Sequence, residues 1–195
     1  MSDNKTYGGI TSMKTVDASN YDANAAEFRE QLATGKYELD KSFLSPSGAY
    51  VLYETGHNHH EAELEAAMAL ADAGINVTMT REDKAEFAHF IDANTGSPKF
   101  VEGKLATEQL TYEQRSPVKS NPKGGMYTVH SALQHAESKR ADIALIYDRN
   151  GSLHRSDIGK GISHYNKSRT KRFKAIFVVD SKGGVHEWFH TRQKK

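Results

Sequence analysis

The chain has 195 residues, which at about 100–200 residues per domain predicts one domain, and its lack of cysteine excludes disulfides, thiolate metal sites and cysteine nucleophiles. Hydrophobic residues make up 37% and charged residues 26%, which predicts a polar globular protein, and no apolar run approaches the roughly 18 residues of a membrane span. Residues 1–114 carry a net charge of −10 and residues 115–195 a net charge of +11. The basic part favours a polyanionic partner such as nucleic acid, with solvated lysines as the alternative.

Residues 1–45 are predicted to form an N-terminal arm or linker, ahead of a domain that spans residues 46–195. Within the arm, Phe28 and Leu32 lie four residues apart and predict a short helix over Ala23–Leu32. The start of the chain has no basic stretch followed by an apolar one. We therefore expect no cleavable signal peptide, no membrane contact and a cytoplasmic site of action.

Helical and strand patterns alternate from residue 46 onward. Apolar residues three and four apart predict helices at Glu61–Ala73, Thr128–Ser138 and Ser156–Lys167. Alternating or continuous apolar runs predict strands at Ala49–Tyr53, Ile75–Met79, Phe90–Asp92, Phe100–Leu105, Asp142–Tyr147, Phe173–Val179 and Val185–Phe189. The polar stretches Arg81–His89 and 107–125 have no such pattern, and the second is predicted to be a loop. The order predicts an α/β fold with a mixed β-sheet flanked by helices, since the final hairpin disfavours an all-parallel sheet.

The first candidate site combines Asp92 with the segment Glu102-Gly103-Lys104. Residues two apart on a strand share a face, so Glu102 and Lys104 are expected to project together, and Asp92 can meet them from the adjacent strand. Two carboxylates form an oxygen site for Mg²⁺ or Mn²⁺. A lysine beside that ion can orient water or neutralise the charge that develops on a phosphate. These groups suit phosphodiester hydrolysis, and the alternative is an exposed hairpin with an ordinary Glu–Lys pair.

Three glutamates near the start of the helix Glu61–Ala73 are candidates to complete this site. Glu63 lies on the flank of the apolar stripe and is expected to point toward Asp92. Glu65 is expected to face solvent, and Glu61 is the close competitor of Glu63. The alternative is that all three only favour the positive end of the helix dipole.

Two segments that flank the carboxylate–lysine set carry a family resemblance. The first is Glu63–Gly74, in which Ala follows the glutamate at +4 and Leu-Ala follows at +7 and +8, before the glycine. The second is Ser131–Ala136, followed by the buried-strand pattern Ala141–Tyr147. In this order the segments resemble the PD-(D/E)xK nuclease fold. More narrowly, they resemble the carboxy-terminal nuclease domains of contact-dependent growth-inhibition toxins and related polymorphic or phage toxins, over about Ser47–Trp188.

The resemblance implies a metal-dependent endonuclease, of the tRNase or DNase type. It implies that Glu63, Asp92 and Glu102 are catalytic residues that hold Mg²⁺ or Mn²⁺, and that Lys104 is the catalytic lysine beside the ion. It also implies delivery within a larger effector or a phage particle and, for a toxin, a cognate immunity protein as partner. The chain departs from the family pattern at two positions, with isoleucine in place of proline before Asp92 and glycine between Glu102 and Lys104.

The segment His57-Asn58-His59-His60 is a second candidate metal site, because three imidazoles within four residues suit Zn²⁺. A zinc hydrolase would use His57 and His59, completed by Asp92 or a later histidine. Two other interpretations stay open. The histidines can face solvent at the start of the helix, or one of them can contact phosphate in a nuclease cleft.

The basic segment Arg149–Lys174 is a candidate nucleic-acid surface, because cations with aromatic residues among them suit single-stranded or structured nucleic acid. The cations expected to line or flank the approach to the acidic site are Lys160, Lys167, Arg169, Lys171 and Arg172. The alternative is a solvated helix and turn. Two functions therefore stay open: a metal-dependent nuclease, or a non-catalytic nucleic-acid- or protein-binding module on the same fold.

Overall fold

The computed structural model describes residues 18–81, 86–89, 99–101, 104–106, 109–117, 123–169 and 173–188. Its helices are α1 (Ala18–Ala33), α2 (Glu61–Asp72), α3 (Gly125–Ser138) and α4 (Arg155–Ser168). Its strands are β1 (Phe43–Leu44), β2 (Tyr50–Tyr53), β3 (Asn76–Met79), β4 (Glu86–His89), β5 (Lys99–Val101), β6 (Lys104–Ala106), β7 (Gln109–Arg115), β8 (Ile143–Tyr147), β9 (Ala175–Val179) and β10 (Val185–Trp188). No helix in these ranges is both long enough and apolar enough to cross a membrane.

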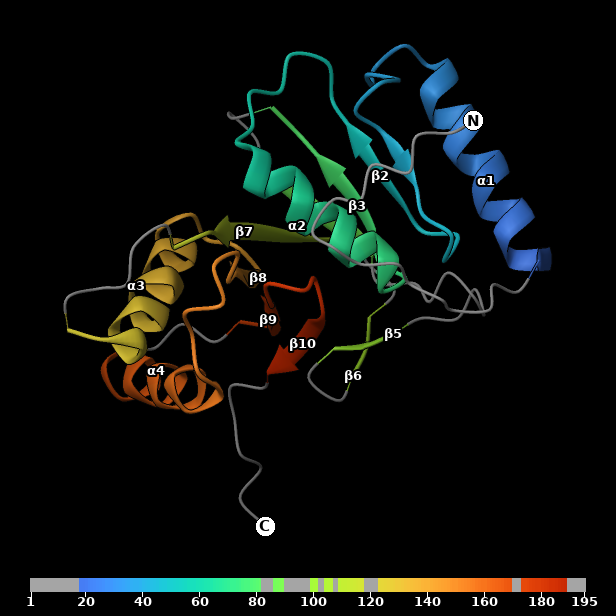
Figure 1. Ribbon diagram of the computed structural model, residues 1–195. Coiled ribbons are helices and arrows are strands. Elements are labelled where there is room, and N and C mark those ends of the chain that lie inside the picture. Colours follow the sequence, from blue (N-terminus) through green and yellow to red (C-terminus); the bar gives the residue numbers. More distant parts are fainter. Residues whose placement is uncertain are drawn as a thin grey trace.

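In the described part of the chain, eight strands form one mixed sheet in the order β1-β2-β3-β4-β7-β8-β9-β10, and β5 and β6 form a separate antiparallel pair (Figure 1). Strands β2 and β3 are parallel, as are β7, β8 and β9. Strand β4 is antiparallel to both β3 and β7, and β10 forms an antiparallel hairpin with β9. The α/β fold with a mixed sheet flanked by helices, predicted from the sequence, is confirmed.

Helices cover both faces of this sheet. Figure 1 shows α2 crossing the sheet on one face, with α1 at one end of the molecule and the α3–α4 pair at the other. Val51 and Tyr53 pack in the same cluster as α2, whereas Tyr50 and Leu52 pack with Phe28 of α1. The same alternation on β8 and β9 places one set of side chains with α2 and the other with α3 and α4. Burial on both faces explains the nearly continuous apolar runs of these strands.

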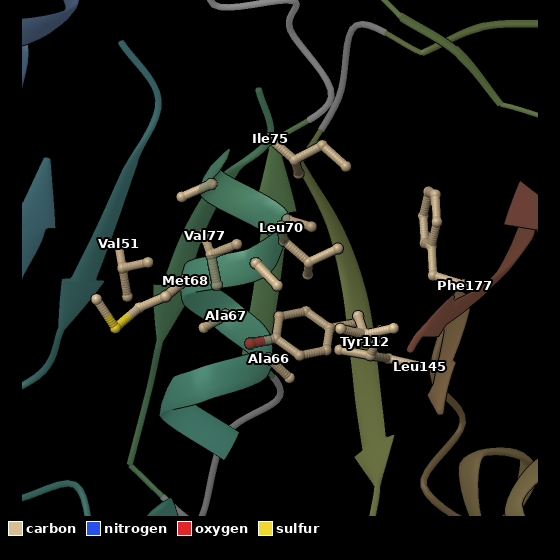
Figure 2. Close-up of a cluster of buried hydrophobic side chains, with 14 of the residues drawn as sticks. Val51, Ala66, Ala67, Met68, Leu70, Ile75, Val77, Tyr112, Leu145 and Phe177 are labelled. Carbon is tan, nitrogen blue, oxygen red and sulfur yellow. The ribbon is translucent and has the colours of Figure 1, made fainter. Parts of the chain in front are cut away.

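Small side chains allow α2 to lie close to the sheet. Four of the six consecutive buried residues of this helix are alanines. Ala66, Ala67 and Tyr112 of β7 belong to one buried cluster, and Figure 2 shows Ala66 beside the Tyr112 ring. The helix is followed by Gly74, whose φ of 87° favours glycine, and the Ile75 N–H donates to the Leu70 carbonyl at 3.0 Å. This glycine stop returns the chain directly into β3.

Two predictions about the middle of the chain are wrong. The stretch 107–125, expected to be a loop, contains the central strand β7, whose Leu110 and Tyr112 are buried. Polar residues at its end hide the alternation that marks a strand. The single strand expected at Phe100–Leu105 is two strands, because β5 and β6 pair with each other. The expected strand Phe90–Asp92 lies outside the described residues.

The other predicted helices and strands are confirmed, with ends shifted by a few residues. The segment predicted to be an arm or linker contains α1 and β1. Strand β1 pairs with β2, and Phe28 of α1 packs on the same strand. Strand β4 lies in a stretch where the sequence has no clear pattern.

Candidate metal centre and its cleft

A cleft of about 940 Å³ opens at one edge of the sheet. It lies where the parallel strands β7 and β8 end, between the start of α2 and the side of α3. In open α/β sheets, ligands bind outside the carboxyl ends of such strands. The lining is of mixed charge, because glutamates, histidines and arginines from four parts of the chain line it together.

A cluster of metal-ligating groups lies at this edge and consists of His57, Glu63 and Glu86. Each residue offers one ligand atom, and these atoms all lie within 4.8 Å of one another. His57 follows β2, Glu63 is in the first turn of α2, and Glu86 is the first residue of β4. Glu63 also lines the cleft. The segment after β2, the start of α2 and the more distant strand β4 therefore bring two carboxylates and one imidazole together.

Local structure explains why Glu63 occupies this position. His60 is the residue that precedes α2, and its backbone N–H donates to the Glu63 carboxylate at 3.3 Å, as part of a capping box. The alanine-rich face of α2 is buried against the sheet, so Glu63 at its flank is half-buried beside Glu86. The expected direction of Glu63, toward Asp92, stays a prediction, because Asp92 lies outside the described residues.

Electrostatics in the cluster favour a cation. Burial raises the pKa of Glu63, and the nearby Glu86 carboxylate raises it further. Tyr112 lies directly opposite Glu86 in the β4–β7 register, and burial, together with Glu86, raises the pKa of its hydroxyl well above the usual range. Two half-buried carboxylates that repel each other are stabilised by a divalent ion between them.

The donor set fits a divalent metal ion. The His57 side chain is only 4% exposed, and its Nε2 lies 3.2 Å from Glu86 Oε1, while its Nδ1 is buried without a hydrogen-bond partner in the described structure. A buried nitrogen of this kind is costly unless something binds it. Two carboxylate oxygens with one imidazole suit Mn²⁺ or Zn²⁺, and carboxylates alone suit Mg²⁺.

The other histidines of the His57–His60 segment have different partners. The Nδ1 of His59 is hydrogen-bonded to the Tyr53 hydroxyl. Burial lowers the pKa of His59, and the neighbouring His57 lowers it further. His60 caps α2. Of the residue pair that the zinc interpretation uses, the structure therefore places only His57 in the metal-ligating cluster.

The expectation that Glu65 faces solvent is wrong. Its side chain is 8% exposed, accepts a hydrogen bond from the Tyr147 hydroxyl at 2.7 Å and pairs with Arg149 at 2.7 Å. Arg149 also pairs with Glu61 at 3.2 Å, so one guanidinium joins the start of α2 to the end of β8. The sequence missed this contact because it depends on the order of strands in the sheet.

The opposite wall of the cleft carries a second carboxylate–imidazole pair. Glu113 of β7 and His135 of α3 both line the cleft, and Glu113 Oε1 lies 2.8 Å from His135 Nε2. The next residue, Gln114, donates through Nε2 to the Ala62 carbonyl at 3.2 Å, while its Oε1 is buried without a partner in the described structure. Neither Glu113 nor Glu86 was recognised from the sequence, because each lies in a strand whose pattern is masked by polar residues.

The remaining predicted site residues are placed only in part. Asp92, Glu102, Lys171 and Arg172 lie outside the described residues, and Lys104 begins β6, with its side chain also outside them. These roles stay predictions.

Three of the predicted nucleic-acid-binding cations are described. Lys160 and Lys167 are exposed on α4, and Arg169 follows the helix with its Nε 3.8 Å from Glu137 Oε2. None of the three is among the residues that line the cleft. A role at the approach to the cleft therefore stays a prediction.

Comparisons with known proteins give one structural similarity. No protein-family model matches the chain, and no curated protein matches it. The structure is similar to a chain of the CdiA-CT/CdiI toxin and immunity complex from Burkholderia pseudomallei, with 14% sequence identity and a TM-score of 0.41. The similarity covers 65% of this chain and 81% of that one. At this level the similarity carries no argument about function.

Proposed function

We propose that this protein is a metal-dependent nuclease that hydrolyses phosphodiester bonds in RNA or DNA. The observation that carries the proposal is the convergence of His57, Glu63 and Glu86, whose ligand atoms lie within 4.8 Å of one another at the edge of a 940 Å³ cleft. A cleft of this size accommodates a nucleotide. The exposed Arg115 in its lining offers a phosphate contact.

The residues of the cluster have separate tasks in this proposal. Glu63 and Glu86 supply negative charge, and His57, held against Glu86, supplies a nitrogen ligand. A divalent ion bound there supplies Lewis-acid chemistry and activates water for attack on phosphorus. Because the set includes an imidazole, we expect Mn²⁺ or Zn²⁺ to bind more tightly than Mg²⁺.

The roles derived from the sequence remain part of the proposal. Asp92 and Glu102 are proposed as further metal ligands and Lys104 as the catalytic lysine. The five cations proposed to bind nucleic acid are Lys160, Lys167, Arg169, Lys171 and Arg172. A toxin role, with a cognate immunity protein as partner, is proposed on the sequence resemblance alone.

The first test combines cleavage with metal binding. Plasmid DNA and total transfer RNA are incubated with the purified chain and Mg²⁺, Mn²⁺, Zn²⁺ or EDTA, and Mn²⁺ affinity is measured by calorimetry. We expect Glu63→Gln, Glu86→Gln and His57→Asn to lose cleavage and at least about tenfold in Mn²⁺ affinity. Glu63→Gln preserves the helix cap, because glutamine serves equally at this position. Asp92→Asn is expected to lose cleavage with little change in melting temperature.

Glu61→Gln is the matched control, since Glu61 lies on the same helix but is 71% exposed and outside the cluster. It should cleave and bind Mn²⁺ like the wild type. Undiminished cleavage in EDTA, or unchanged Mn²⁺ affinity in both Glu63→Gln and Glu86→Gln, contradicts the metal centre. Nucleic-acid binding without cleavage by any metal form supports the non-catalytic binding module.

A further inference from the structure

The carboxylate–imidazole pair of Glu113 and His135 lies in the wall of the cleft opposite α2. Both side chains are about one-third exposed, at 29% and 31%, although they are 2.8 Å apart. Both line the cleft that Glu63 also lines. The pair is therefore accessible to a molecule in the cleft, while each member already orients the other.

The fold explains how the pair meets. Successive side chains of a strand point to opposite faces, so Gln114 reaches α2 while Glu113 reaches α3. His135 is three residues before the end of α3, the helix that packs against β7. The end of β7 therefore positions Glu113, and α3 positions His135.

The contact also determines which ring nitrogen is available. A carboxylate only accepts hydrogen bonds, so the His135 Nε2 that faces Glu113 carries the hydrogen. Its Nδ1 is then the nitrogen that exchanges a proton with a ligand. A carboxylate that fixes the tautomer and orientation of a histidine is a recurring device in acid–base catalysis.

We propose that His135 is the general acid that protonates the leaving sugar oxygen, with Glu113 as its positioning residue; this inference rests on the nuclease function proposed above. In an in-line displacement at phosphorus, the attacking and leaving oxygens lie on opposite sides. The metal-ligating cluster is joined to the cleft through Glu63 on the α2 wall, and His135 is on the α3 wall. If water is activated on the α2 side of the cleft, the His135 imidazole on the α3 side lies toward the leaving oxygen.

The step balances as follows. A water oxygen forms a bond to phosphorus, and the bond between phosphorus and the leaving sugar oxygen breaks. The leaving oxygen takes the proton from His135 Nδ1, which gives a sugar hydroxyl and a neutral imidazole. The attacking water releases a proton to solvent, from which His135 is protonated again, so that the net reaction is the addition of one water across the P–O bond.

The test measures steady-state cleavage of a labelled oligonucleotide at saturating Mn²⁺, together with Mn²⁺ affinity by calorimetry. His135→Gln keeps a donor for Glu113 but transfers no proton, and His135→Ala leaves space for added imidazole. We expect both variants to lose about 10²–10⁴ in kcat, with KM and Mn²⁺ affinity nearly unchanged. Imidazole should restore activity to His135→Ala but not to His135→Gln. Glu113→Gln should lower kcat and shift the pH profile.

His186→Gln is the control, because His186 forms a pair of the same 2.8 Å length with Asp180 on an exposed hairpin away from the cleft lining. Wild-type kcat in His135→Gln, or failure of imidazole to restore His135→Ala, overturns the assignment and leaves the metal centre standing. If the Glu63, Glu86 and His57 variants lose cleavage but His135→Ala keeps it, the general-acid assignment is likewise overturned while the metal centre stands. Absence of cleavage by the wild type with every metal overturns both proposals.

Discussion

Gly161→Ala is expected to destabilise the protein, because α4 contacts α3 closely at this residue. A Cβ atom on Gly161 lies 2.5 Å from Val129 Cβ and 2.7 Å from the Met126 carbonyl oxygen. Carbon atoms pack at about 3.5–4.0 Å, so the helices must separate by about 1 Å. Gly159 is the matched control in the same helix, since a Cβ atom there meets nothing nearer than Trp188 at 3.8 Å.

The magnitude follows from two opposing contributions. Overpacking costs about 1–3 kcal/mol, and replacing a helical glycine by alanine returns up to about 1 kcal/mol. Because a backbone oxygen cannot rotate away, we expect Gly161→Ala to lose about 1–2 kcal/mol and Gly159→Ala to gain up to about 1 kcal/mol. At about 2–4 °C per kcal/mol, the melting temperatures of the two variants differ by at least about 2 °C in thermal unfolding. Equal melting temperatures refute the close α3–α4 contact at Gly161. This contact holds α3, the helix that carries His135, at the cleft.

Two further predictions concern carboxylates of α2. Burial raises the pKa of Asp72, which accepts a 2.6 Å hydrogen bond from Ser45. The unfolded chain then ionises first, so the Asp72 contribution to the free energy of unfolding falls as pH rises above 3.8. The wild-type minus Asp72→Asn difference should decrease from about pH 4 to 7 in urea titrations, and a constant difference contradicts the prediction. Double-mutant cycles should give about 1–2 kcal/mol for Arg149–Glu65 and under about 0.5 kcal/mol for Arg149–Glu61. The couplings should differ because the Glu65 side chain is 8% exposed and the Glu61 side chain is 71% exposed. Equal coupling energies for the two pairs contradict this prediction.

The sequence predicts those elements of the fold whose apolar pattern is regular. Helix α2 and strands β8 and β9 are recognisable because each buries consecutive or evenly spaced apolar residues. Strands β4 and β7 are not, because each has few apolar residues and ends in polar ones. Strand order is a further limit, since a sequence pattern does not state which strands are neighbours. The parallel pairing of β7 with β8, which creates the cleft edge, therefore appears only in the structure.

The candidate site is predictable to the same extent. Glu63 is a candidate from the sequence because its helix is regular and its helical phase places it on the flank of the buried face, while its direction toward Asp92 stays a prediction. His57 was noted for its spacing alone, and Glu86, in a short polar strand, gave no signal. The assignment of Glu65 to solvent failed because its partners, Tyr147 and Arg149, come from a distant strand end. Helical phase predicts a direction, but long-range pairing decides whether a polar side chain is buried.

The end of β7 connects the two walls of the cleft. Glu113 pairs with His135 on α3, and the next residue, Gln114, donates to the Ala62 carbonyl in α2. Each of these two polar side chains has a partner on a different helix, although Gln114 Oε1 is buried without a partner in the described structure. Through these two contacts the end of β7 is attached to both α2 and α3, the helices that carry Glu63 and His135. The polarity that hides this strand in the sequence is the same property that allows it to organise the cleft.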